Sequence, residues 1–300
     1  MNKILKEKEI KRWWDSKRQL RWKNIYEGKD YSSLALNNRE FKILDYLSKN
    51  NKKLNILEIG FGGGQLAYKI LKEGHIYTGI DVSSNLTKIA NAKCKKYQKK
   101  KYNFSVGSFN KRLKFKNNCF DLVIMAGVLQ YSSNPKFVFS EINRVLKEKG
   151  EFICAQTNIF KLHFFFKFRT LLIRFYYFLS KEKYAINDSL RSFFLETKLK
   201  KYVNKSFKKF VINNKYCNKG YSVNKFDFKK RIFFRKKLID LGKQNNFTVI
   251  TKDACGPYLQ IGYKFSIYAI LNYILEIFSN IFFFKFLKKF GESQIIIFKK

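Results

Sequence analysis

The sequence predicts an α/β protein with a doubly wound, mostly parallel sheet of seven strands, N-terminal helices and helical, aromatic-rich insertions. Three observations predict it. Short apolar runs alternate with helical stretches between residues 54 and 155, a glycine-rich turn follows the first run, and the second run ends at Asp81. Strands that alternate with helices form parallel sheets, and such sheets bind ligands beyond the carboxyl ends of their strands.

The first half of the chain supplies most of the sheet. Residues 3–26, with their three tryptophans, and Leu34–Leu47 are expected to be helices on either side of a polar break at 30–33. Apolar runs then predict strands at Leu54–Ile59, Ile76–Ile80, Tyr102–Val106, Cys119–Met125 and Glu151–Ala155. Helical spacing predicts helices at 65–73, 83–100 and Pro135–Lys147, with Gly150 capping the last.

The α/β pattern stops after residue 157 and resumes near residue 227. A helix at 227–243, a strand at Phe247–Thr251, an apolar helix at 263–290 and a strand at Gln294–Phe298 are expected there. We therefore divide the chain into an N-terminal helical segment (1–49), a core (50–157), an insertion (158–226) and the end of the core (227–300), with 263–290 as a second insertion.

The turn after the first strand reads Glu58-Ile-Gly60-Phe-Gly62-Gly-Gly64. Glycines let the backbone approach a ligand closely, and the helix that follows points its free N–H groups into the turn. A dinucleotide site would need Gly or Ala at position 65, where Gln65 stands. Carboxylates at the ends of buried strands are costly without partners, so Glu58 and Asp81 are expected to serve a ligand, Asp81 through ribose hydroxyls.

These residues resemble motif I, E/D-x-G-x-G-x-G, of the class I S-adenosylmethionine (SAM) dependent methyltransferases. The stretches from Phe120 to Pro135 and from Glu141 to Ile153 resemble the type 11 group of that family. The resemblance covers about 50–157 and 227–300 and implies S-adenosyl-L-methionine as cofactor and an antiparallel last strand. The cofactor residues it implies are Glu58, Gly60, Phe61, Gly62, Gly64, Asp81, Val82, Ser108, Phe109, Ala126 and Gly127.

Within this set the resemblance implies particular roles. The backbone at 126–128 would meet the methionine end of SAM, and Val82 would pack on the adenine. Ser108 stands where the family commonly has an aspartate that binds the adenine amino group. Each has a structural alternative: Val82 and Phe109 as core residues, and Ser108 as a turn residue. Asp121 is expected to be structural.

No catalytic base is evident, and the catalytic residues stay unassigned. Some relatives carry Glu-His where Gln130 and Tyr131 stand here. His75 is expected away from the pocket, and His163 lies in the aromatic insertion. Alignment of the activated methyl group supplies most of the rate in such reactions. The Asn/Asp-Pro-Pro-Tyr/Phe segment of the enzymes that methylate nucleic-acid amino groups is absent after the fourth strand, and hydrolase, zinc and Walker A motifs are absent as well.

Composition is strongly basic. Lys and Arg number 62 against 22 Asp and Glu, a formal net charge of +40. This suggests an anionic partner such as nucleic acid or a membrane face, but the Lys-, Asn-, Ile- and Phe-rich bias of an AT-rich genome explains it equally. The five cysteines form no C-x-x-C pair and the first residues contain no apolar signal segment, so a reduced, cytoplasmic setting without disulfides or bound metal is expected.

The two insertions are rich in aromatic residues. In 265–284, the polar residues Asn272, Glu276, Ser279 and Asn280 share one helical face, which indicates an amphipathic helix and not a membrane span. In 158–184, Lys167, Arg174 and Lys181 recur every seven residues among Phe, Tyr and Leu. A lid over the core and a helix lying in an anionic membrane interface are both consistent with this.

Taken together, these features predict methyl transfer from SAM to a small or amphiphilic acceptor (a lipid, quinone or glycolipid precursor), with localisation in the cytoplasm and peripheral contact with the inner membrane face. An RNA methyltransferase that uses the basic surface is the first alternative, with nucleic acid the less favoured partner. A non-catalytic peripheral membrane protein on a methyltransferase scaffold is the second.

Overall fold

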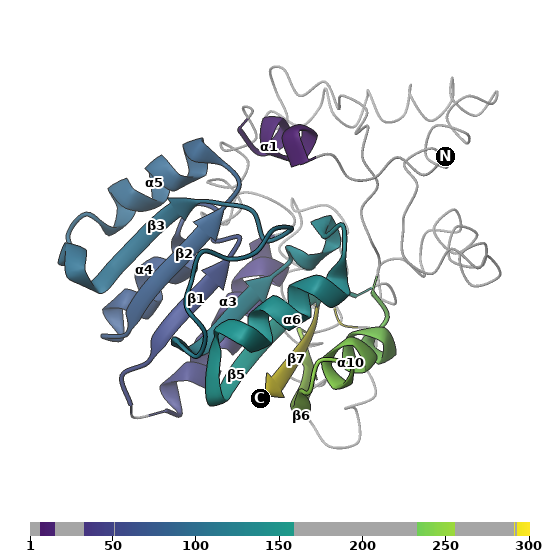
Figure 1. The fold of residues 1–300 in the computed structure, drawn as a ribbon. Coiled ribbons are helices and arrows are strands. Elements are labelled where there is room, and N and C mark those ends of the chain that lie inside the picture. The colour runs from purple at the N-terminus through teal and green to yellow at the C-terminus, as the bar shows by residue number, and fades with distance from the viewer. Residues whose placement is uncertain (1–6, 16–32, 51, 159–232, 256–290, 292) are drawn as a thin grey trace, which may run out of the picture.

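The computed structural model describes residues 7–15, 33–50, 52–158, 233–255, 291 and 293–300. They contain a seven-stranded sheet of order β3-β2-β1-β4-β5-β7-β6 (Figure 1). β1 to β5 pair in parallel, whereas β7 runs antiparallel to both β5 and β6. The predicted doubly wound sheet with an antiparallel last strand is confirmed.

The strands are β1 (Asn55–Ile59), β2 (Ile76–Asp81), β3 (Tyr102–Val106), β4 (Phe120–Ala126), β5 (Leu146–Thr157), β6 (Thr248–Ala254) and β7 (Ser293–Lys299). The helices are α1 (Glu7–Asp15), α3 (Ser33–Ser48), α4 (Gln65–Lys72), α5 (Ser84–Cys94), α6 (Pro135–Val145) and α10 (Arg235–Lys243), with short 3₁₀ turns η1 (Lys99–Lys101) and η2 (Leu129–Tyr131). Apart from β5 and β6, every strand lies within one residue of its predicted bounds.

Two helix ends were predicted wrongly. α6 ends at Val145, and Gly150 does not cap it, because the buried Leu146 already pairs with Phe120 as the first residue of β5. The chain then loops out before Glu151 resumes the pairing. α5 ends at Cys94 and not near residue 100, because Cys94 is its last buried residue and the segment that follows carries a cluster of like charges, which disfavours a helix.

Three further boundaries differ from prediction. Ser33 begins α3 and is not part of a break. α10 begins at Arg235, because Phe233 and Phe234 precede the helix, Phe233 buried and Phe234 extended. β6 extends to Ala254 because β7 pairs with it that far. The segments 158–226 and 263–290 lie almost entirely outside the described residues, as do His163, Cys217 and Trp22.

Helices cover both faces of the sheet (Figure 1). α3, α4 and α5 bury their apolar residues on one face, and α6 and α10 bury theirs on the other. Successive strand residues alternate between these cores, so Ile56 faces α3 and α4 while Leu57 and Ile59 face α6. Glu58 shares the face of Ile56, which directs this carboxyl group toward α3 and α4.

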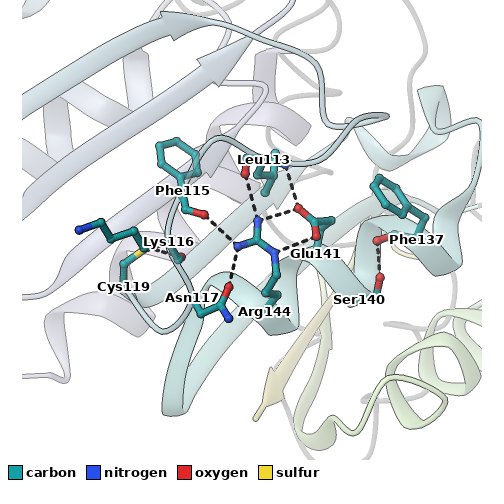
Figure 2. A network of polar contacts seen from close by, with 9 residues as sticks. All are labelled: Leu113, Phe115, Lys116, Asn117, Cys119, Phe137, Ser140, Glu141 and Arg144. Carbon is teal, nitrogen blue, oxygen red and sulfur yellow. Dashed lines mark hydrogen bonds and ion pairs between the residues drawn. The ribbon is translucent and has the colours of Figure 1, made fainter.

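Arg144 of α6 organises the long connection between β3 and β4 (Figure 2). Its guanidinium donates to both carboxylate oxygens of Glu141 (2.8 Å each) and to the backbone oxygens of Phe115 (2.8 Å) and Leu113 (3.0 Å). Glu141 in turn accepts from the Leu113 N–H (2.8 Å), and Arg144 holds the pKa of this carboxyl below its usual range. Bidentate pairs of this kind fix geometry, so the connection that carries residues 107–110 is anchored to α6.

No helix in the described parts of the chain combines the length and the apolar character needed to cross a membrane. Within these parts of the chain, Cys94, Cys119 and Cys154 are free thiols.

Candidate cofactor site

A cavity of about 220 Å³ lies beyond the carboxyl ends of the central strands. It is lined by the glycine turn, the segment after β3, the end of β4, and residues of α1 and α3. Of the cofactor residues predicted from sequence, all but Gly64 line it. The topology therefore gathers them in one place, as expected for a parallel sheet.

Asp81 ties the end of β2 to the glycine turn. One carboxylate oxygen accepts from the N–H of Gly62 (3.0 Å) and the other from the N–H of Ser83 (2.9 Å). Gly62 has φ of +57°, and a Cβ added there would meet nothing within 4 Å, so glycine is needed for the backbone conformation and for an open cavity floor. Asp81 is only 8% exposed, and its burial raises its pKa to about 6.

Gly64 has a different position from the one expected. It is the N-cap residue of α4, with φ of +73°, and an added Cβ would lie 2.8 Å from Cβ of Ala90 in α5. Its small size thus serves the packing of α4 against α5 and does not form part of the cavity wall.

Glu58 lines the cavity from β1 and is 4% exposed. The hydroxyl of Tyr77 donates to its Oε2 (2.7 Å). Burial raises the pKa of Glu58 to about 8, against the lowering effect of that hydrogen bond. The tyrosine partner could not be foreseen from sequence, because it depends on the register of β1 and β2.

Two charged residues of α3 that line the cavity were not predicted from the sequence. Arg39 and Glu40 of α3 are 8% and 4% exposed, and both line the cavity. Arg39 forms no hydrogen bond or ion pair with a described residue. A Cβ added to Gly127 would lie 2.8 Å from Nη1 of Arg39, so the guanidinium is next to the backbone at Gly127. The signal was present, because these charges interrupt the helical stripe formed by Leu36, Ile43 and Leu47.

α1 covers another part of the cavity. Ile10 and Trp14 line it, and the Trp14 ring meets the edge of Tyr131 at 6.0 Å between centroids. Asp15, at the end of α1, accepts from the Ser83 hydroxyl (2.6 Å) and from the N–H of Asn85 (3.3 Å). The carboxylate of Asp15 thus binds the N-terminus of α5, where negative charge is stabilised.

Residues 108–110 and 130–131 form the remaining wall. Ser108 Oγ accepts from the N–H of Asn110 (3.2 Å), and the Asn110 side chain links to the backbone of Tyr131 and Ser133. Gln130 donates to the Gly127 oxygen (2.9 Å). Ser108 therefore lines the cavity and is also a turn residue, while its contact with the adenine stays a prediction.

Comparison with known proteins decides the family. Residues 57–154 match the family model described as a methyltransferase domain. Residues 57–154 of this chain are a class I SAM-dependent methyltransferase domain.

The relatives agree with this assignment. The demethylmenaquinone methyltransferase of Tropheryma whipplei is 29% identical over 101 residues, which cover 34% of this chain and 41% of the relative. The ubiquinone biosynthesis O-methyltransferase of Pelagibacter ubique is 30% identical over 120 residues, 40% of this chain and 48% of the relative. The chain thus spans less than half the length of these curated relatives.

A solved structure supports the fold. The magnesium protoporphyrin IX methyltransferase of Synechocystis PCC 6803 with bound SAH aligns with a TM-score of 0.56 at 12% identity, over 98% of this chain and 99% of that one. At this identity the likeness concerns the fold alone.

The cavity of the methyltransferase domain fits the cofactor of its family. Gly62 leaves the floor open, Asp81 has acceptor capacity beyond the two N–H groups it binds, and charges of both signs lie at one end.

No histidine or cysteine is among the described lining residues. His75 accepts from the N–H of Leu54 outside the cavity, and Asp121 pairs with Lys147 and accepts from the N–H of Asn55. Within the described residues no cluster of acidic, His or Cys side chains could hold a metal ion.

Proposed function

We propose that this protein transfers the methyl group of SAM to a small or amphiphilic acceptor, with lipids, quinones and glycolipid precursors as the expected classes. The observation that carries the proposal is the cavity itself. It joins a carboxylate-braced glycine turn to a set of buried charges and an aromatic wall. Both curated relatives described above are named as methyltransferases of menaquinone or ubiquinone synthesis, which supports an acceptor of the quinone class.

Different residues of the cavity would bind different parts of the cofactor. Asp81 would accept hydrogen bonds from the ribose hydroxyls, and Val82, Ser108 and Phe109 would border the adenine. Arg39 is the cation available to the methionine carboxylate, beside the backbone at Gly127. These assignments follow from chemistry and position: ribose needs acceptors, adenine an apolar slot with one polar contact, and a carboxylate a cation.

The cofactor supplies a methyl group already activated on a sulfonium sulfur. The protein then has to align the acceptor and exclude water, tasks that positioning alone can perform. α1 suits the second task, because Trp14 and Ile10 present an apolar cover to the cavity while Asp15 fixes the end of the helix on α5. Gln130 and Tyr131, at the positions of the Glu-His pair of some relatives, provide no strong base.

A labelling experiment tests the proposal. Protein is incubated with methyl-labelled SAM and host-cell extract, and the label is partitioned into organic-soluble, water-soluble and nuclease-sensitive fractions. Label in the organic phase is expected. Absence of transfer to any fraction would favour the non-catalytic alternative.

RNA methylation is the second candidate, favoured by the net charge of +40 and by exposed lysines 95, 96, 99 and 100 between α5 and β3. RNA binding of that kind would weaken steeply with added salt. Label released by nuclease would establish it and exclude the amphiphile.

A basic surface would also suit an anionic membrane, and vesicle co-sedimentation that falls with salt would support peripheral attachment.

Replacing Asp81 tests the cofactor assignment. We expect Asp81→Ala to weaken SAM binding by ~1–3 kcal/mol, through lost hydrogen bonds to the ligand and lost support for Gly62. Asp81→Asn keeps the size and one acceptor oxygen and should cost less. Calorimetric titration measures both, and unchanged affinity in Asp81→Ala would show that this carboxylate does not contact the ligand.

A further inference from the structure

We propose that Glu40 is a cofactor-binding residue whose Oε1 accepts a hydrogen bond from the α-ammonium group of the methionine moiety, with Lys69 as the positioning residue. The inference rests on the proposed function and deepens it. It assigns a role to a residue that precedes the glycine turn by some twenty positions and lies in no motif of the sequence.

The two carboxylate oxygens of Glu40 have different surroundings. Oε2 pairs with Nζ of Lys69 in α4 at 3.0 Å. Oε1 is buried and has no hydrogen-bond partner among the described residues, although the side chain lines the cavity. A buried acceptor without a partner costs free energy, so a native structure usually supplies one, and here the cavity is where it can come from.

Lys69 does not itself explain the burial of Glu40. The lysine side chain is 48% exposed, whereas that of Glu40 is 5% exposed. A half-exposed partner recovers little of the free energy lost when a carboxylate leaves water. The ion pair does fix the direction of the carboxylate, because it holds Oε2 on the α4 side.

The charges near Glu40 match an amino-acid zwitterion. Arg39 is the adjacent residue on α3, also faces the cavity and forms no hydrogen bond within the described part of the chain. Beyond the effect of burial, Glu40 raises the pKa of Glu58 and Arg39 lowers it, so both charges lie near that carboxyl group. A donor with positive charge is therefore favoured beside Oε1 of Glu40, and an anion is favoured at Arg39. The α-ammonium and α-carboxylate of one ligand meet both needs.

The decisive experiment compares two ligands that differ in the zwitterion. S-adenosylhomocysteine carries the amino-acid group, and 5′-methylthioadenosine lacks it while retaining adenine, ribose and sulfur. Calorimetric titration of wild type and Glu40→Gln with both gives a ratio of affinities that a general folding defect does not change. We expect Glu40→Gln to lose about tenfold to hundredfold for S-adenosylhomocysteine and less than about twofold for 5′-methylthioadenosine.

Two variants serve as controls. Asp45→Asn removes an exposed carboxylate from the same helix, where it pairs with Lys49 away from the cavity, and should leave both affinities unchanged. Lys69→Gln frees Oε2 and should reduce the preference for S-adenosylhomocysteine less than Glu40→Gln does. Thermal melts of each variant report on folding.

Four results would overturn the inference. Unchanged affinity of Glu40→Gln for S-adenosylhomocysteine excludes contact with the ammonium, and an equal loss for both ligands makes Glu40 a structural residue. Wild type that binds both ligands alike shows that the zwitterion is not recognised, while the proposed function stands. Wild type that binds neither ligand removes the proposed function together with this role of Glu40.

Discussion

Buried carboxyl groups dominate this site at the scale of single residues. Glu58 and Asp81 lie near the carboxyl ends of neighbouring strands, and both are nearly inaccessible. The two carboxyl groups have different pKa values because their surroundings differ. Asp81 accepts two backbone N–H groups and its burial raises its pKa to about 6, whereas Glu58 has one tyrosine donor and its burial raises its pKa to about 8. Near neutral pH the first is charged and the second largely holds its proton, so they present different chemistry to a ligand.

The pKa of Glu58 predicts a pH dependence of stability. Between its ordinary pKa of 4.5 and its folded value of about 8, the native protein holds a proton that the unfolded chain has released. The free energy of unfolding therefore falls as pH rises through this window. Glu58→Gln has no ionisable group at this position. Without ligand, the thermal midpoint of this variant should therefore fall less between pH 5 and pH 8 than that of the wild type.

The comparison isolates Glu58 because Asp81 titrates in both proteins. After burial, the pKa of Glu58 depends on four neighbouring groups, and the variant keeps all of them: Tyr77, Arg39, Glu40 and Asp81. Parallel pH profiles for the two proteins would mean that Glu58 ionises normally in the folded state.

At the scale of elements, the contact between α4 and α5 determines how the glycine turn is held. Gly64 is the N-cap residue of α4, has a left-handed conformation and lies against Ala90 of α5. The N-cap residue of α5 is Ser83, whose N–H donates to Asp81 and whose hydroxyl donates to Asp15 of α1. The turn, α5 and α1 are thus connected through short contacts, and the shape of the cavity depends on the spacing of these helices.

Gly64→Ala should destabilise the protein by ~2–4 kcal/mol, the sum of left-handed strain and overpacking against Ala90. Urea denaturation measures the loss. Ala90→Gly removes the neighbouring Cβ but leaves Cα of residue 90 at 3.0 Å from the added Cβ, so in the double variant the overpacking part should shrink and the strain should remain. Additive effects of the two changes would contradict close packing at this point.

Charge is the main feature at the scale of the whole molecule. A net charge of +40 on 300 residues opposes the compact state through self-repulsion. The ion pairs between described residues, such as Lys42 with Asp253 and Lys147 with Asp121, offset only part of it. This holds whether the charge serves a partner or reflects codon bias.

Stability should therefore rise with ionic strength. We expect the thermal midpoint to increase as sodium chloride is raised from about 10 to about 300 mM, because screening lengths shrink from roughly 30 Å toward the spacing of surface charges. Potassium glutamate at equal ionic strength should act alike if screening is the cause. A midpoint that stays constant or falls would show that repulsion is not limiting.

Much of the fold could be read from local pattern. The alternation of apolar strands and helices gave five of the seven strands within a residue, and the glycine turn with Asp81 located the cavity. Two of the wrongly predicted ends lie where long-range pairing or burial overrides local preference. Leu146 joins β5 because β4 offers a pairing partner, and Phe233 stays out of α10 because the core buries it.

The sequence alone was sufficient to predict a mostly parallel sheet, a methyltransferase domain and the cavity residues that follow its strands. Each of these features depends on residues that are neighbours along the chain. It could not reveal that Gly64 packs on Ala90 or that Tyr77 binds Glu58, and it marked Arg39 and Glu40 as charges on an apolar helix face without showing that they enter the cavity. Those contacts join residues on different elements. They depend on how α3, α4 and α5 pack on the sheet, a property of the folded core that no single stretch of sequence encodes.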